Sequence, residues 1–213
     1  MNELIKNIPV VALRGMTLLP SMITHFDISR EKSVRAVETA MMGDQKVYLV
    51  TQRNPQQEVP TAADLYQMGT VSQIKQIVKM PNGILRVMVE GLERAALLTL
   101  FEDGQYLEAE IEDAPMQEEQ LSDTVKEAMS RIVKEKLEEF GNANPKAVKD
   151  FIGSLLVITD LEPLLTQTAN EFPWDFAVKQ ELLECDYVSH LYDRIVYYLT
   201  REIEILMIKR DYQ

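Results

Sequence analysis

The fold of the first half of the chain is decided by residues 70–91, TVSQIKQIVKMPNGILRVMVEG. Thr70–Lys79 and Ile84–Gly91 each have the length of a strand, and apolar and polar side chains alternate along the second. Pro81-Asn82-Gly83 lies between them, and Asn-Gly is the preferred pair for a tight turn with positive φ. We therefore predict a β-hairpin here.

Further short apolar runs surround this hairpin and indicate more strands. They are Ile8–Leu13, Ile23–Ile28, Val47–Thr51, Arg94–Phe101 and Tyr106–Ile111. In Ile23–Ile28 the alternation places Ile23, His25 and Asp27 opposite Thr24, Phe26 and Ile28. One helix is expected at Ser33–Met42, where the apolar positions keep a spacing of three and four residues, with Ser29 as its N-cap. These patterns predict a small, curled β-rich domain.

The second half of the chain has the periodicity of helices. The expected helices are Glu118–Phe140, a helix that starts at Asn144-Pro145 and continues through Leu156, Asp160–Ala169, Pro173–Cys185, and Tyr187–Arg210 with Asp186 as its cap. The last one carries a continuous apolar stripe, which is typical of a helix bundle. We therefore expect an α+β protein with a β-rich domain at residues 1–113, a linker at 114–120, and an all-α bundle at 121–213 that ends in a long helix.

Charge argues against a nucleic-acid-binding function. The net charge is −12, of which residues 1–111 contribute −2 and residues 112–213 contribute −10. Because binding to phosphates needs a basic face, the acidic half is a poor match for nucleic acid, and the nearly neutral half gives no support either.

No pattern for catalysis, cofactor or metal binding is present. The phosphate-binding, dinucleotide-binding, serine-hydrolase and zinc-protease motifs are all missing. Cys185 is the only cysteine and is flanked by Glu184 and Asp186, which disfavour a thiolate nucleophile. His25 has no second potential metal ligand at helical spacing. His190 has only Asp186, four residues before it, and a single His–Asp pair is far more often a surface hydrogen bond than a metal site. We expect no cofactor, no metal and no enzymatic activity in this chain, and its lack of a signal peptide or membrane-spanning run indicates the cytoplasm.

Two surface regions are candidates for binding another protein. Apolar side chains cluster around the turn at Pro20-Ser21 and beside the hairpin turn, and an exposed, Met-bearing groove would bind many unfolded segments. The candidate substrate-binding residues are Leu18, Leu19, Met22, Phe26 and Met80. The alternative is that they belong to the core. The charged residues Arg30, Glu31, Lys32 and Arg35 form either a docking surface or a solvated helix face, with Glu31 and Arg35 paired at i,i+4.

The order of several motifs resembles the N-terminal region of bacterial Lon ATP-dependent proteases, over essentially the whole chain. The motifs are Ile8-Pro9-Val10-Val11-Ala12-Leu13-Arg14-Gly15, Leu19-Pro20-Ser21-Met22, residues 29–38, Gly69-Thr70-Val71, residues 79–83, residues 86–94, Lys179-Gln180-Glu181-Leu182-Leu183-Glu184 and Glu202-Ile203-Glu204. The resemblance implies a PUA-like β pseudobarrel followed by a helical bundle. It also implies a longer parent enzyme, a hexamer whose ATPase module and Ser–Lys protease dyad lie in other domains.

The function that this resemblance implies is non-catalytic recognition. The chain would bind unfolded or damaged protein segments and help assemble the hexamer, without binding nucleic acid or membrane. Two alternatives remain open at this point. One is a stand-alone adaptor or regulatory protein built from the same region. The other is an RNA-binding module, because PUA-like folds can bind RNA, although a basic face with interleaved aromatic residues is missing.

Overall fold

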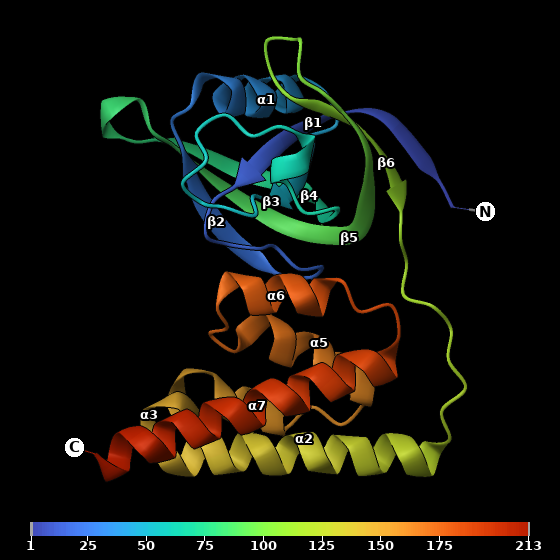
Figure 1. Ribbon diagram of the computed structural model, residues 1–213, viewed down its shortest axis with the longest axis vertical. Coiled ribbons are helices and arrows are strands. Elements are labelled where there is room, and N and C mark those ends of the chain that lie inside the picture. Colours follow the sequence, from blue (N-terminus) through green and yellow to red (C-terminus); the bar gives the residue numbers. More distant parts are fainter. Residues whose placement is uncertain (1, 213) are drawn as a thin grey trace. The chain divides into compact units, whose positions relative to one another are not determined.

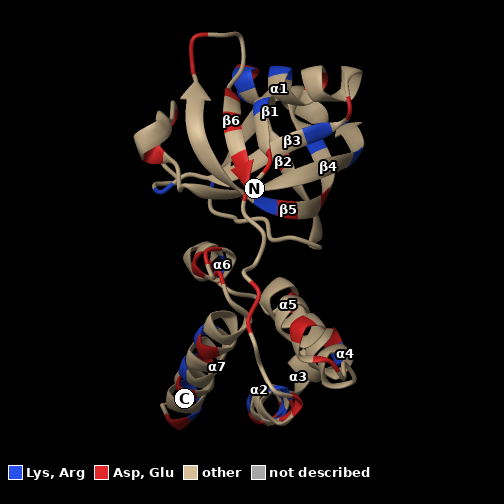
Figure 2. Cartoon of the chain, turned by 90° about the vertical axis from the view of Figure 1, so that its right-hand side faces the viewer, with Lys and Arg blue, Asp and Glu red and all other residues tan. Residues whose placement is uncertain are grey.

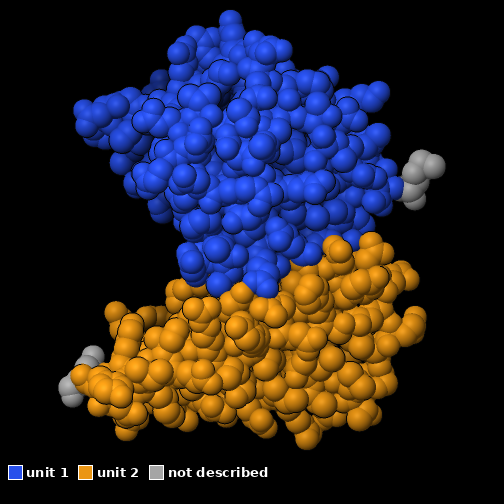
Figure 3. All heavy atoms as spheres, viewed as in Figure 1, with its two compact units in different colours: residues 1–115, 175–184 blue, residues 116–174, 185–213 orange. Residues whose placement is uncertain are grey.

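A computed structural model describes residues 2–212 as two compact units (Figure 3). The first unit contains Met1–Pro115 together with Asp175–Glu184, and the second contains Met116–Trp174 and Cys185–Gln213. The expected division into 1–113, 114–120 and 121–213 differs from these units at residues 175–184, which lie with the β-rich part of the chain.

The first unit is built on a six-stranded sheet in the order β2-β5-β4-β3-β1-β6. The strands are β1 (Leu4–Leu13), β2 (Ile23–Ile28), β3 (Lys46–Thr51), β4 (Met68–Lys79), β5 (Leu85–Phe101) and β6 (Glu108–Asp113). An additional pairing between β5 and β6 curls the sheet into a pseudobarrel (Figure 1). All pairs are antiparallel except β1 with β3.

Strand β5 closes the pseudobarrel because it is long enough to pair with three neighbouring strands. It pairs with β4 along most of its length, with β2 at residues 85–90, and with β6 at residues 95–101. Two separate strands were expected here, and the structure joins them into one of 17 residues. The hairpin between β4 and β5 lies where it was predicted, with Asn82 and Gly83 at φ 64° and 74°.

Helix α1 (Glu31–Met42) packs on the pseudobarrel with Ser33, Ala36, Val37 and Ala40 buried. Its N-cap is Arg30, whose side chain does not cap the helix, instead of the expected Ser29. The core of the unit consists of two clusters of mainly β-branched and leucine side chains, and only one of them includes residues of α1. Two short 3-10 turns, Ala62–Asp64 and Pro81–Gly83, complete the loops.

Helix α6 (Phe176–Leu183) belongs to the first unit, although its sequence resembles its helical neighbours in the chain. The buried Gln180 donates a hydrogen bond from Nε2 to the Met68 carbonyl of β4, at 3.0 Å. The buried Arg94 of β5 donates from Nη1 to the Leu183 carbonyl, at 2.9 Å. These contacts, made over about a hundred residues of sequence, fasten α6 to the sheet.

The second unit is helical. Its elements are α2 (Asp123–Ala143), α3 (Pro145–Ala147), a π-helical turn (Val148–Ile152), α4 (Gly153–Leu156), α5 (Leu161–Glu171) and α7 (Val188–Asp211). A cluster of aromatic rings, Phe140, Phe151, Phe172 and Trp174, lies in its core with successive centroids 4.1–6.4 Å apart. The long C-terminal helix is present as expected, and it buries Ile195, Leu199 and Ile203.

The start of α7 is capped by a residue distant in sequence. Asp186 was the expected cap, but the N-cap position is Tyr187, whose side chain does not cap the helix. The Glu119 carboxylate instead accepts hydrogen bonds from the Ser189 backbone N–H, at 3.0 Å, and from the Ser189 hydroxyl, at 2.5 Å. A carboxylate at this position also interacts favourably with the helix dipole.

Candidate functional site

The turn at Pro20-Ser21 is held against strand β5. Ser21 has φ 69°, its N–H donates to the Gly91 carbonyl, and the Gly91 N–H donates to the Met22 carbonyl, at 2.9 and 2.8 Å. A Cβ atom on Gly91 would lie 2.2 Å from the Leu19 carbonyl oxygen, so no larger residue fits here without moving the backbone. The turn is therefore positioned by its contact with a glycine of the sheet.

Three threonines fix the segment that leads into this turn. The Thr17 and Thr51 hydroxyls are 2.9 Å apart, and Thr51 also donates to the Met16 carbonyl at 2.8 Å. Thr70 donates to the Leu18 carbonyl at 2.6 Å. The backbone carbonyls of this segment thus accept hydrogen bonds from buried threonine side chains, which hold the segment in place.

Most of the candidate substrate-binding residues are buried. Leu18, Leu19 and Phe26 are less than one tenth exposed, and Leu18 and Phe26 belong to the core cluster beneath α1. Their burial favours the core interpretation for these three residues. Met22 is only partly buried and packs at the edge of the same cluster.

Met80 does not lie near the other candidates. It is half-buried beside the hairpin turn, where its N–H donates to the Ile84 carbonyl at 2.8 Å. Met22 is bonded to Gly91 at the other end of the β2-paired part of β5. A strand rises about 3.3 Å per residue, so Ile84 and Gly91 lie roughly 20 Å apart. The structure therefore separates Met80 from the Pro20 turn.

Two exposed apolar residues beside the turn were not among the candidates. Ile23 is 67% exposed and Leu92 is 38% exposed, and both are sequence neighbours of residues that form the turn contact with Gly91. The sequence did indicate that Ile23 is exposed, because the alternation in β2 places it on the same face as the exposed His25 and Asp27, opposite Phe26. We call Met22, Ile23 and Leu92 the turn patch.

The charged residues at the start of α1 hold loops to the pseudobarrel. Arg30 donates from Nη1 to the Glu58 carbonyl and from Nη2 to the Ala12 carbonyl, at 2.9 and 3.0 Å. Lys32 donates to the Glu102 carbonyl at 3.0 Å. Arg35 forms the expected ion pair with Glu31, with 2.8 Å between Nη2 and Oε1. Figure 2 shows Lys and Arg (blue) on α1 and acidic residues (red) on the loop between β5 and β6.

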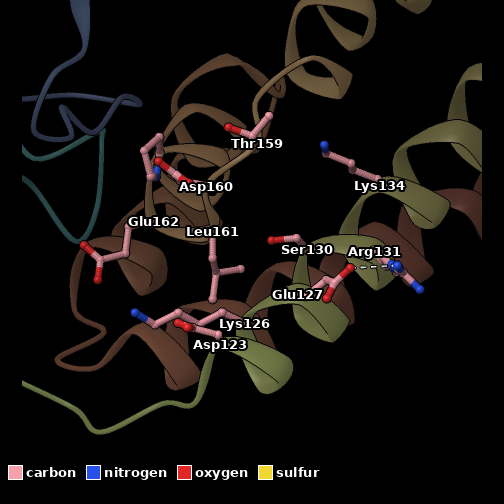
Figure 4. Close-up of a pocket in the computed structure, with 11 residues that line it drawn as sticks. Asp123, Lys126, Glu127, Ser130, Arg131, Lys134, Thr159, Asp160, Leu161 and Glu162 are labelled. Atoms are coloured by element: carbon pink, nitrogen blue, oxygen red, sulfur yellow. Dashed lines mark hydrogen bonds and ion pairs between the residues drawn. The ribbon is translucent and has the colours of Figure 1, made fainter.

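A hollow in the helical unit lies between α2 and the start of α5 (Figure 4). It has a volume of about 640 Å³ and is lined by three basic and four acidic side chains. Arg131 is paired with Glu127, with 2.7 Å between Nη2 and Oε1, and the Ser130 hydroxyl points into the hollow. Among the described residues that line the hollow, only Leu161 and Pro163 are apolar, so it offers little surface for an apolar group of a ligand.

Within residues 2–212, no group of three or more His, Cys, Asp or Glu side chains is placed to hold a metal ion. Over the same residues, no helix is both long and apolar enough to cross a membrane. The Cys185 side chain is buried.

Comparisons with known proteins identify the family. The model of the ATP-dependent protease La (LON) substrate-binding domain matches residues 7–201. The chain belongs to the Lon substrate-binding domain family. Its relatives include a Lon protease of Lachnoclostridium phytofermentans, 38% identical over the whole chain, and Lon protease 1 of Bacillus subtilis, 31% identical over 98% of the chain.

The chain spans about a quarter of the length of these relatives, 26% and 27% respectively. Among solved structures, the N-terminal domain of a Mycobacterium avium complex Lon protease has a TM-score of 0.69 at 18% identity, over 92% of this chain and 98% of that one. A Lon N-terminal domain protein from Xanthomonas campestris has a TM-score of 0.63 at 12% identity, over 91% and 99%. The expected α+β fold, a β-rich part followed by helices, is confirmed.

Proposed function

We propose that this Lon-family chain is a non-catalytic recognition region that binds unfolded or damaged protein segments in the cytoplasm. The bound segments would be delivered to ATPase and protease domains elsewhere in a longer chain, assembled as a hexamer. The observation that carries the proposal is the match of residues 7–201 to a substrate-binding domain. The lengths of the relatives support it, because about three quarters of each lies outside the region matched by this chain.

The turn patch is the surface that best suits this role. Met22 and Ile23 are presented by a backbone that Gly91 and buried threonines hold in place. A rigid apolar surface binds without an ordering cost on its own side, and the flexible Met side chain adapts to different partners. Such contacts are weak individually and tolerant of sequence. The two properties suit recognition of segments that share only exposed apolar residues.

The first test measures binding of the chain to a chemically unfolded model protein, to the same protein folded, and to a single-stranded RNA. We expect binding to the unfolded form alone. Binding to RNA, or equal binding to both protein forms, would contradict the proposal. Absence of any binding at high micromolar concentration would also count against it for this chain on its own.

A pair of substitutions tests the turn patch. Ile23→Asp should weaken binding to the unfolded protein roughly tenfold, because fully burying an aliphatic side chain contributes about 1.5–3 kcal/mol and tenfold corresponds to about 1.4 kcal/mol. Met42→Asp is the matched control, since Met42 is 84% exposed on the same unit but lies at the end of α1. Equal loss in both variants, with unchanged melting temperatures, would remove the turn patch from the proposal.

A further inference from the structure

A second recognition element lies in the first unit, at the N-terminal end of α1. A cavity of about 480 Å³ opens there between α1, the end of β1 and two loops. Its volume falls within the range of about 300–1,000 Å³ that is usual for ligand pockets. Its lining includes three basic side chains (Arg14, Arg30 and Lys32), three acidic ones (Glu31, Glu58 and Glu102) and the apolar residues Val59, Pro60 and Leu107.

The two arginines carry charges that no carboxylate neutralises. Arg14 donates from Nε to the Pro55 carbonyl at 2.7 Å, and Arg30 donates to two backbone carbonyls. Neither forms an ion pair with any residue between 2 and 212. Partial burial lowers the pKa of the Arg30 guanidinium, and the positive charge of Arg14 lowers it further. The carbonyls therefore fix both guanidinium groups in position, and neither group is paired directly with a carboxylate.

The start of α1 adds neutral donors to the same cavity. The first N–H groups of a helix lack intrahelical partners and carry the positive end of its dipole. In α1 no side chain at the N-cap satisfies them. Ser33, in the first turn, lines the cavity and is only 6% exposed. Its hydroxyl makes no hydrogen bond to the described part of the chain. The hydroxyl oxygen is not among the fully buried polar atoms that lack a partner, so it can donate to water or to a ligand in the cavity.

We propose that this cavity binds the C-terminal carboxylate of a protein segment whose last side chain is apolar. Guanidinium groups and a helix N-terminus together suit an oxyanion. The apolar wall, which includes Val59 at 71% exposure, suits a side chain attached next to that oxyanion. The inference deepens the proposed function, because it names a chemical feature of the bound segment.

Acidic residues near the cavity set a limit on its affinity. Glu31 is engaged by Arg35, but Glu58 and Glu102 also line the cavity and form no ion pair with residues 2–212. Their carboxylates repel an incoming anion. Removing one of these charges should therefore strengthen binding, which is the opposite of the effect expected for a cavity that binds cations.

The test uses the whole chain and fluorescent hexapeptides with a C-terminal leucine, with either a free carboxylate or an amide at the end. A third peptide carries an internal aspartate and an amidated end. At low salt we expect the free acid to bind at least about tenfold more tightly than either amide. Arg14→Gln should remove this preference and Glu102→Gln should increase it. Lys79→Gln, on the exposed hairpin, should leave it unchanged.

Several outcomes would overturn the inference. One is equal binding of the free-acid peptide and its amide. Another is equal binding of the free-acid peptide and the amidated peptide with an internal aspartate. A third is that inorganic phosphate displaces all three peptides while the chain shows no preference among them. If the unfolded model protein binds while the peptides show no preference, only this inference fails. If the chain prefers the free-acid peptide but does not bind the unfolded protein, the inference about the cavity is supported and the proposed function is contradicted.

Discussion

At the scale of single residues, Glu119 joins two parts of the helical unit. Its carboxylate accepts both hydrogen bonds that Ser189 offers at the start of α7. These bonds lower the pKa of the Glu119 carboxyl below its usual value of 4.5. A carboxyl with a lowered pKa in the folded state stabilises the fold above its unfolded pKa, and that contribution is lost as the pH falls through the folded pKa.

We therefore expect Glu119→Gln to lower the melting temperature at pH 7, with a difference from the parent chain that shrinks as the pH falls below about 4.5. Thermal unfolding followed between pH 3 and pH 7 measures this. Glu118→Gln, at the exposed neighbouring position, serves as the control. A difference that stays constant across this pH range would show that the charge of Glu119 does not matter.

At the scale of elements, Arg94 connects β5 to two segments outside the sheet. Its side chain is buried, with Nε donating to the Ala114 carbonyl at 2.5 Å and Nη1 to the Leu183 carbonyl at the end of α6. Burying a guanidinium is tolerated when such acceptors surround it. The sheet thus holds α6 through polar groups as well as apolar packing. These hydrogen bonds distinguish α6 from a helix that packs through its apolar side chains alone.

Replacing Arg94 with methionine keeps the side-chain volume but leaves those carbonyls without a donor. We expect a loss of about 1–3 kcal/mol in the free energy of unfolding for each buried group left unsatisfied. Urea denaturation measures it. Arg86→Met on the same strand is the control, because Arg86 makes only an exposed ion pair with Asp27, and such pairs contribute about 0–1 kcal/mol. Equal losses in the two variants would contradict this role for Arg94.

At the scale of the whole molecule, the chain crosses between its two units three times, because α6 belongs to the first unit while the residues on either side belong to the second. If the chain is cut once, between Pro115 and Met116, α6 remains covalently attached to the second fragment and packed against the first. The contacts of Gln180 and Arg94 with this helix are independent of the covalent connection at Pro115.

A protease site inserted between Pro115 and Met116 tests this arrangement. After complete cleavage, we expect the two fragments to elute together in size-exclusion chromatography and to separate in urea. Arg94→Met combined with Gln180→Ala, cleaved in the same way, should release the fragments at a lower urea concentration. If the fragments of the parent chain separate in buffer without urea, the contacts between α6 and the sheet are too weak to keep the cleaved chain together.

Features that depend on neighbouring residues could be predicted from the sequence alone. The Asn82-Gly83 turn, the alternation that buries Phe26 and exposes Ile23, and the apolar stripe of α7 all follow from local periods of 2 and 3.6 residues and from turn chemistry. The ordered motifs also identified the family. The sequence placed apolar residues around the Pro20 turn but left open which of them reach the surface.

Features that depend on contacts between distant residues could not be predicted from the sequence and follow from the three-dimensional packing. Leu18 is buried because Thr70 and the sheet fix the segment before the turn, and α6 lies with the first unit because Arg94 and Met68 offer it partners. The cavity beside Arg30 exists because loops separated by many residues meet at the start of α1. Local patterns cannot specify such contacts, since the same amphipathic helix or arginine fits several positions until long-range packing selects one.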